Sequence, residues 1–247
     1  MEDNKRAKIV VIEGTDGSGK ETQSKLLYEH LTRNGLKVKN YSFPMYGTPT
    51  GKIVGGPYLG KPEICTSFFE EKSAAVDPLV SCLYYAADRR YNFLNEIEGE
   101  LSKNDVVLLD RYVTSNMGHQ SGKAHTPELR AKILKFIETL EYDLCELPKP
   151  DEVVFLHMPC EAAKELRKGR PASDGNEDSE EHQKAAELAY VQIAKDNGWD
   201  IIDCLKTATF NTLEDIRSIP EISEEVIRIV ENCLGKENGP LRKMTRF

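Results

Sequence analysis

The sequence has no long apolar segment and no excess of basic residues. The longest apolar run near its start, residues 9–12, is soon followed by Gly14 and is far too short for a signal peptide or a membrane span. Lys and Arg number 33 against 41 Asp and Glu, a net charge of -8, whereas proteins that bind nucleic-acid duplexes present a basic surface. We therefore expect no membrane or nucleic-acid partner. A small phosphorylated substrate needs only a few local cations.

Cysteine motifs are also lacking. The six cysteines are unevenly spaced, at Cys65, Cys82, Cys145, Cys160, Cys204 and Cys233. None forms a C-x-x-C pair, and no histidine lies at ligand spacing from a cysteine pair, so the spacing favours neither a zinc site nor a disulfide framework. We expect reduced thiols in a cytoplasmic protein.

Short apolar segments alternate with longer amphipathic stretches along the 247 residues. Five segments have strand patterns: 8–13, 37–43, 105–110, 152–157 and 199–204. Six stretches have helical spacing: 20–33, 78–103, 127–141, 160–168, 179–196 and 221–234. Strands separated by long helices predict right-handed βαβ units, and so an α/β fold with a five-stranded parallel sheet flanked by helices. No repeat or linker divides residues 1–247, which predicts a single domain.

Two segments depart from this alternation. Residues 47–62 are crowded with Gly and Pro and predict an irregular segment over the sheet edge. Residues 171–181 are acidic and rich in turn formers, which is typical of a disordered loop and equally of a lid that orders over a ligand. We assign a small lid to about 167–181, and we interpret 236–247, which match no pattern, as a flexible tail.

The most informative motif is the glycine-rich run GTDGSGK at 14–20, because an apolar strand precedes it and an amphipathic helix follows it. This is the context that the G-x-x-x-x-G-K phosphate-binding loop requires. Backbone N–H groups and the positive end of the helix would hold the phosphates, with Lys20 as a mobile cation. The other donor-site candidates are Gly14, Thr15, Gly17, Ser18 and Gly19 in the loop, and Glu21 and Thr22 directly after it.

The residue after Lys20 departs from the pattern. It is normally Ser or Thr, whose hydroxyl helps to hold Mg²⁺, but here it is Glu21, and Thr22 comes one position too late. A carboxylate at Glu21 could ligate Mg²⁺ or could repel the phosphates. The sequence leaves these two alternatives open.

Four further motifs follow in order: FPMYG at 43–47, LYYAADRR at 83–90, DRYVTSN at 110–116 and LPKPD at 147–151. Together with the loop, they resemble the thymidylate kinase family over about residues 8–199. The resemblance implies a P-loop NTP hydrolase-like three-layer fold and a homodimer. It also implies direct in-line transfer of the γ-phosphoryl group of ATP to dTMP, with Mg²⁺.

The resemblance implies roles for residues around the reacting phosphates. Arg111 matches an arginine between donor and acceptor, where its fork suits bidentate contact, and Asp110 would orient it or the metal shell. Asp16 matches a carboxylate near the acceptor's 3′-hydroxyl and the metal, although a loop-stabilising Asx-turn is its alternative. The expected catalytic residues are thus Lys20, Arg111, Asp110 and Asp16, and the metal candidates are Glu21, Asp16 and Asp110.

For the acceptor, Tyr85 and Arg89 lie four apart on one predicted helix, so both can face one pocket. By family analogy Tyr85 stacks on the pyrimidine, Arg89 reaches the base edge or the monophosphate, and Asn116 reads the thymine edge. A core tyrosine beside a surface arginine, and a capping role for the asparagine, are the alternatives. The remaining acceptor candidates are Phe43, Pro44, Tyr46, Ser115 and His119.

His119 stands where many relatives have Tyr near C2′ of the sugar. An imidazole is smaller and partly cationic near pH 6.5, which predicts looser sugar discrimination. The other histidines match no site pattern and are interpreted as structural or exposed: His30, His125, His157 and His182.

Arg167 and Arg170 are candidates for contact with ATP on lid closure, because Gly17 and Ser18 leave the loop without an arginine. A solvated helix C-terminus explains these basic residues equally well.

Two other functions stay open. The first is a P-loop kinase of another deoxynucleotide, such as dUMP, or of a nucleoside, which is compatible with Glu21, His119 and Tyr46. Glu21 and the acidic lid leave room for a nucleotide-binding homologue without catalysis. An apolar run could form the dimer face or belong to the core, and it comprises Leu79, Val80, Leu83, Tyr84 and Ala87.

Overall fold

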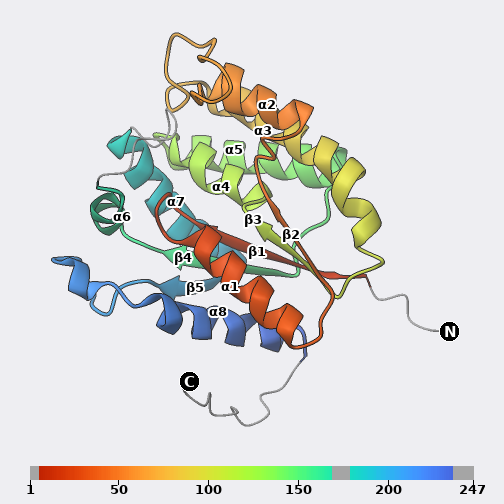
Figure 1. Cartoon of the computed structure of the whole chain (residues 1–247). Helices are drawn as coiled ribbons and strands as arrows, with labels where there is room; N and C mark the ends of the chain where they lie inside the picture. Colours follow the sequence, from red (N-terminus) through yellow and green to blue (C-terminus); the bar gives the residue numbers. More distant parts are fainter. Residues whose placement is uncertain (1–5, 169–178, 236–247) are drawn as a thin grey trace.

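A five-stranded parallel sheet forms the centre of the molecule (Figure 1). The computed structural model of the chain describes residues 6–168 and 179–235. The strands are β1 (Lys8–Gly14), β2 (Val38–Ser42), β3 (Val106–Asp110), β4 (Glu152–His157) and β5 (Asp200–Asp203). Their order is β2-β3-β1-β4-β5, and every neighbouring pair is parallel. Each strand begins and ends within one residue of its predicted segment, so the predicted α/β sheet is confirmed.

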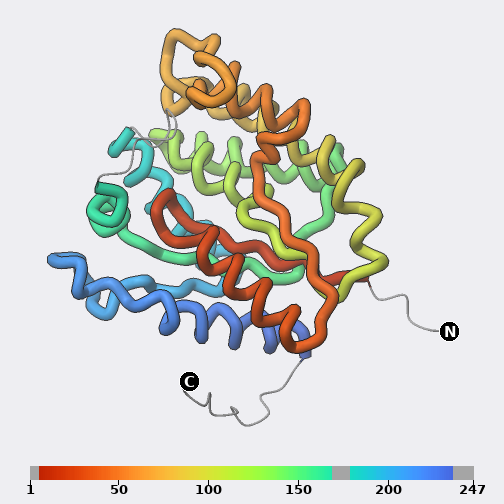
Figure 2. The backbone as a smooth tube through the Cα atoms, viewed as in Figure 1, coloured from red at the N-terminus to blue at the C-terminus, as the bar shows by residue number. Residues whose placement is uncertain are grey.

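The sheet brings together segments that are distant in sequence, with the N-terminal strand at its middle (Figure 2). Within β1, Ile9 and Val11 point to one face, whereas Val10 and Ile12 point to the other. All four side chains are buried. Burial on both faces explains why this strand is continuously apolar rather than alternating.

Helices cover both faces of the sheet (Figure 1). The described α-helices are α1 (Lys20–Arg33), α2 (Pro49–Ile53), α3 (Pro78–Asn92), α4 (Val113–Gly122), α5 (Pro127–Glu138), α6 (Cys160–Arg167), α7 (Glu180–Asn197) and α8 (Ile219–Cys233). One core joins α1 and α8 to the sheet, through Leu27 and Val226 among others. The other core joins α4 and α7 to the opposite face, with α3 and α5 packed against them.

The prediction of an irregular segment at 47–62 is wrong. Thr48 caps α2, since its side chain accepts a hydrogen bond from the N–H of Gly51, and Pro49 suits the first helical turn. A wider π-type turn, Val54–Tyr58, continues from α2. Its Tyr58 is fully buried and gives the segment a small apolar core of its own.

Helix α4, like α2, is an element that the sequence did not predict. Every residue of its sequence VTSNMGHQSG is buried, and most are polar or small. Because α4 has no solvent-exposed face, it lacks the apolar stripe by which helices are recognised in sequence.

Several predicted boundaries shift. The helices predicted at 78–103 and 127–141 end as regular α-helix at Asn92 and Glu138, and both continue in π-type turns. The predicted tail 236–247, Arg170 and most of the predicted lid lie outside the described residues.

No helix within residues 6–168 or 179–235 combines the length and the apolarity needed to span a membrane. All six cysteines are free thiols, as predicted.

Helices α4 and α7 approach closely because two glycines face α7. A Cβ on Gly118 would lie 2.4 Å from the ring of Tyr190, and a Cβ on Gly122 would lie 3.0 Å from the backbone of Ala185. A side chain at either position would collide with a rigid neighbour.

We expect Gly118→Ala to lower the free energy of unfolding by about 1 to 3 kcal/mol, because the added methyl overpacks a buried interface. Gly99→Ala is the matched control, since its Cβ would meet only the end of Lys103 at 3.9 Å. Urea unfolding followed by circular dichroism measures both variants. Equal midpoints for Gly118→Ala and wild type would contradict this account of the α4–α7 contact.

Candidate active site

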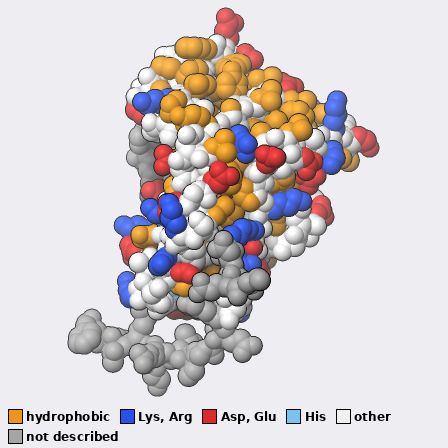
Figure 3. All heavy atoms as spheres, turned by 90° about the vertical axis from the view of Figure 1, so that its right-hand side faces the viewer, with side chains coloured by type: hydrophobic (Ala, Val, Ile, Leu, Met, Phe, Trp, Pro, Cys, Tyr) orange, Lys and Arg blue, Asp and Glu red, His pale blue; other side chains and the backbone are white. Residues whose placement is uncertain are grey.

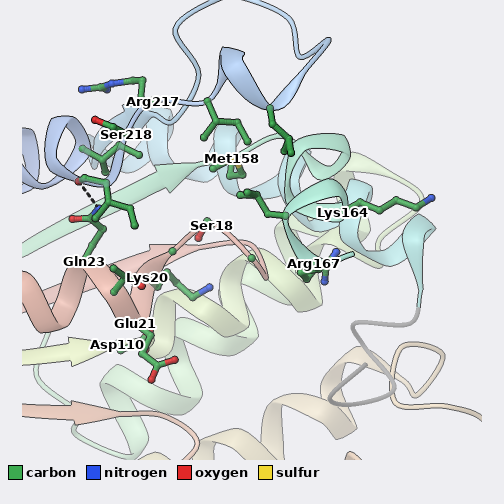
Figure 4. A pocket seen from close by; sticks show the side chains of 18 of the residues that line it. Ser18, Lys20, Glu21, Gln23, Asp110, Met158, Lys164, Arg167, Arg217 and Ser218 are labelled. Carbon is green, nitrogen blue, oxygen red and sulfur yellow. Dashed lines mark hydrogen bonds between the residues drawn. The ribbon is translucent and has the colours of Figure 1, made fainter. Parts of the chain in front are cut away.

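Two cavities meet at the carboxyl ends of the strands, which is where parallel α/β sheets bind ligands. The larger, about 990 Å³, extends from the glycine-rich loop to α6 and to residues 213–222 (Figure 4). The smaller, about 320 Å³, lies between α3, α4 and the segment after β2. Arg111 and Glu21 line both cavities, so groups bound in the two cavities would meet beside these side chains.

The loop between β1 and α1 has the backbone that a phosphate cradle needs. Gly17 and Gly19 have φ angles of 87° and 88°, a left-handed conformation that side chains disfavour. Lys20 begins α1, and its Nζ donates to the carbonyl of Thr15 at 2.8 Å. Burial lowers the pKa of Lys20 to about 8, and Arg111 adds to this effect while Asp16 opposes it.

Most predicted donor-site residues line the larger cavity, namely Gly17, Ser18, Gly19, Lys20, Glu21, Thr22 and Arg167. Gly14 and Thr15 are not in its wall, and the Thr15 hydroxyl donates to the carbonyl of Met158 at 3.3 Å. Arg167 lies against the loop (Figure 4), and its Cδ is 3.3 Å from where a Cβ on Gly17 would stand. The arginine at the end of α6 thus occupies the space that a side chain in the loop would need.

Arg111 is held in an unusual backbone conformation for a residue with a side chain, with φ of 68°. Such conformations persist where the surroundings impose them, often at functional sites. Its guanidinium forms an ion pair with Asp16. Burial would raise the pKa of Asp16, but Arg111 and Lys20 hold it well below its ordinary value. The carboxylate therefore stays charged, and it fixes the guanidinium between the cavities.

The first turn of α7 supports this ion pair from behind. Gln183 Nε2 donates to Asp16 Oδ2 at 3.0 Å. His119 Nε2 lies 3.3 Å from Arg111 Nη1, and His119 Nδ1 lies 3.4 Å from His182 Nε2. Because an arginine only donates, His119 accepts at Nε2 and donates from Nδ1 to His182.

Burial lowers the pKa of His119 well below its ordinary value and that of His182 to about 4. Both rings are therefore neutral near pH 7, and the expectation of a partly cationic His119 is wrong. His182, which matches no site pattern in the sequence, is buried beside the site.

The smaller cavity gathers every predicted acceptor-site residue: Asp16, Phe43, Pro44, Tyr46, Tyr85, Arg89, Arg111, Ser115, Asn116 and His119. Tyr85 and Arg89 face the same cavity, as their spacing predicts, with Arg89 Cζ 6.0 Å from the Tyr85 ring centroid. The sequence did not predict four further lining residues: Ser42, Leu59, Lys61 and Gln120.

A fully buried carboxylate, Glu141, organises one end of this cavity. It pairs with Nε and Nη2 of Arg89, the latter at 2.7 Å, and it accepts from Asn116 Nδ2 at 2.8 Å. Asn116 Nδ2 also donates to the carbonyl of Cys82 at 3.4 Å. The amide N–H groups of Asn116 are thus engaged, and its carbonyl oxygen is the group it can offer to a ligand.

Two more buried carboxylates position the walls. Glu13, at the end of β1, accepts from Thr114 Oγ1 at 2.7 Å, from Ser115 Oγ at 2.8 Å and from Tyr190 Oη at 3.0 Å. These bonds fix the start of α4.

Asp88, on α3, accepts from the N–H of Met45 at 3.0 Å and from Thr50 Oγ1 at 3.0 Å. Burial raises the pKa of Asp88, and these donors oppose the rise. The contacts tie the segment after β2 to α3 across the cavity. Nothing in the sequence singled out Glu13, Asp88 or Glu141 as site residues.

The carboxylates suit a Mg²⁺ ion that is shared with a bound phosphate. Asp110 Oδ1 is buried and has no hydrogen-bond partner among the described residues, and Glu21 is exposed in the mouth of both cavities. Asp16 is instead committed to Arg111. The described residues contain no group of three or more His, Cys, Asp or Glu that could hold a metal. Mg²⁺ commonly binds one or two carboxylates together with substrate phosphates.

Comparison with known proteins agrees with this geometry. The family model for thymidylate kinase matches residues 12–216. The chain is 29% identical to a thymidylate kinase of Plasmodium falciparum, over 92% of this chain and 93% of that one. It is 30% identical to one of Caldanaerobacter subterraneus, over 93% and 97%.

A solved structure of thymidylate kinase from Candida albicans shares the fold, with a TM-score of 0.65 and 23% identity over 94% of each chain. The P-loop kinase fold expected from the motifs is confirmed. The protein belongs to the thymidylate kinase family.

Proposed function

We propose that this protein phosphorylates dTMP to dTDP, with ATP as donor and Mg²⁺ as cofactor, by direct in-line transfer. The main support is that a phosphate-binding loop and a cavity suited to a nucleoside monophosphate meet at one arginine, Arg111. Phosphoryl transfer depends on positioning and on neutralising the charge of the moving group, and this arrangement serves both needs.

In the donor cavity, the loop amides and Lys20 hold the β- and γ-phosphates of ATP. The positive end of α1 adds to this field, because Lys20 is the first residue of the helix. Arg167 adds a cation from α6, beside Gly17. Arg170 is proposed to act with it, on the resemblance alone.

In the acceptor cavity, the pyrimidine stacks on Tyr85 between α3 and α4. Asn116 accepts from N3–H of thymine, because its own N–H groups are engaged with Glu141 and Cys82. Arg89 reaches the base edge with Nη1, its remaining terminal nitrogen. Phe43, Pro44, Tyr46 and Ser115 form the wall, and neutral His119 lies beside the sugar.

Arg111 contacts both the transferred and the receiving phosphate, and it neutralises their negative charge during phosphoryl transfer. Asp16 keeps the guanidinium in place and lies near the acceptor's 3′-hydroxyl. When bound, Mg²⁺ screens and orients the donor phosphates. Asp110 and Glu21 would hold its water shell, with Asp16 the less available carboxylate.

An exposed apolar stripe along α3 supports the proposal of a homodimer. Val80, Leu83 and Ala87 are exposed, and Tyr91 and Leu94 continue the stripe at helical spacing. Leu79 and Tyr84, in contrast, pack against the core, so the predicted run divides between the two interpretations. Figure 3 shows hydrophobic side chains gathered on the upper part of the molecule, at the height of α2 and α3 in Figure 1.

We further propose that the chain works as one kinase unit in the cytoplasm, since its thiols are free and several are buried. The net charge of -8 supports small nucleotides, rather than nucleic acid, as partners. The relatives do not favour a kinase of another acceptor or a homologue without catalysis.

Turnover with ATP, Mg²⁺ and each nucleoside monophosphate tests the proposed function. We expect dTMP to be the preferred acceptor in a coupled assay for ADP. Lys20→Ala and Arg111→Ala should each lower kcat by about a hundredfold to a thousandfold, because each removes a preorganised positive charge. Lys25→Ala, an exposed lysine on α1, is the control. Turnover of AMP or GMP with none of dTMP would refute the proposal.

Glu21→Thr tests the role of the unusual carboxylate. If Glu21 holds the Mg²⁺ shell, the substitution should raise the Mg²⁺ concentration required for half-maximal activity, because a negative ligand is lost. Glu29→Thr, at an exposed position of the same helix, is the control. An unchanged metal titration would exclude the ligand role, and a lower Mg²⁺ requirement would indicate that the carboxylate repels the phosphates.

Leu83→Glu should convert the proposed dimer to a monomer, because a charge would be buried in an apolar interface. Multi-angle light scattering after size-exclusion chromatography measures the mass. Leu188→Glu, an exposed leucine on α7 outside the stripe, should leave it unchanged. A monomeric wild type, or a dimeric Leu83→Glu variant, would rule out this interface.

A further inference from the structure

The acceptor cavity contains a cation that belongs to none of the sequence motifs, Lys61. It follows the π-type turn Val54–Tyr58, and its side chain reaches the cavity although the residue is only 9% exposed. Its N–H donates to the carbonyl of Gly55 at 2.8 Å, and its carbonyl accepts from the N–H of Ile64 at 2.9 Å. Lysines are rarely buried to this extent. The backbone of this lysine is held by the two hydrogen bonds just described.

Lys61 and Tyr46 form one wall of the cavity. The ammonium Nζ lies 4.8 Å from the centroid of the Tyr46 ring, within the range of a cation–π contact. The ring in turn lies against Gly55, where a Cβ would come within 2.8 Å of it. The same glycine therefore allows the close approach of Tyr46 and accepts the backbone hydrogen bond of Lys61.

Ser42 and Arg111 line the same cavity as Tyr46 and Lys61. The Ser42 hydroxyl donates to Asp110 Oδ2 at 3.4 Å, and Asp110 precedes Arg111 in the chain. Glu141, Arg89 and Asn116 form the polar cluster that suits a base. A nucleotide with its base on that cluster and its phosphate at Arg111 would have its phosphate in the cavity that Tyr46 and Lys61 also line.

Lys61 adds a positive charge to a cavity in which two arginines are already engaged in ion pairs. Arg89 is paired with Glu141, and Arg111 is paired with Asp16, so these four charges offset one another. Glu21 adds a further negative charge at the rim. A nucleoside monophosphate brings about 1.5 to 2 negative charges near pH 7. Lys20, which acts on Asp16 from the donor side, and Lys61, in the wall of the acceptor cavity, both bring positive charge toward that phosphate.

We propose that Lys61 binds the phosphate of the acceptor nucleotide. The proposal rests on the proposed function and adds to it a second contact with the acceptor phosphate, besides Arg111, that a nucleoside would not make. The ammonium acts as a compact point charge on the non-transferring phosphate oxygens, opposite the fork of Arg111. Tyr46 holds the lysine stem in the cavity wall.

Binding of dTMP and of thymidine to Lys61→Met and Lys61→Arg tests this role, because thymidine has the base and sugar but no phosphate. Lys61→Met should raise the Kd for dTMP by about tenfold to a hundredfold, the loss expected for a hydrogen bond to a charged group. Its Kd for thymidine should stay at the wild-type value. Lys61→Arg should restore most of the affinity for dTMP. Isothermal titration calorimetry measures each Kd.

Lys52→Met, on the exposed side of α2, is the matched control and should bind both ligands as wild type does. Wild-type affinity of Lys61→Met for dTMP would overturn the proposal. An equal loss of dTMP and thymidine binding would also overturn it, because Lys61 would then shape the cavity rather than contact the phosphate. A wild-type protein that neither binds nor phosphorylates dTMP would refute the proposed function itself.

Discussion

The site depends on one partly buried ion pair, between Asp16 in the glycine-rich loop and Arg111 after β3. A guanidinium and a carboxylate that are largely withdrawn from water are each costly alone, and together they are tolerated because each satisfies the other. Arg111 adopts a left-handed backbone to reach this position, so the surrounding structure must hold it there. The position of Arg111 helps to shape both cavities, since this residue forms part of the wall of each.

Three buried carboxylates also hold neighbouring elements in place. Glu13, Asp88 and Glu141 lie behind the walls of the cavities, and each accepts several hydrogen bonds from groups on different elements. In a water-poor interior such bonds are strong, and an incomplete set is destabilising. The side chains that face a ligand are therefore oriented before it arrives, which reduces the reorganisation that binding requires.

Much of the fold could be predicted from sequence, because it rests on local patterns. The three central strands are apolar on both faces, the loop needs glycines at fixed positions, and Tyr85 and Arg89 share a helix face by spacing alone. Helix α4 escaped prediction because a fully buried helix has no amphipathic stripe. Glu13, Glu141 and His182 were not predicted because their partners are distant in sequence; Glu13, for example, is 101 residues from Thr114. Only the folded chain brings such groups together.

The first turn of α7 is connected to both members of the ion pair. His182 and Gln183 are adjacent in the chain, and they brace opposite partners of the ion pair, one through His119 and the other directly. A small rotation of this turn would loosen the arginine and the carboxylate in a single movement. The position of one helix end thus bears on both members of the ion pair at the same time.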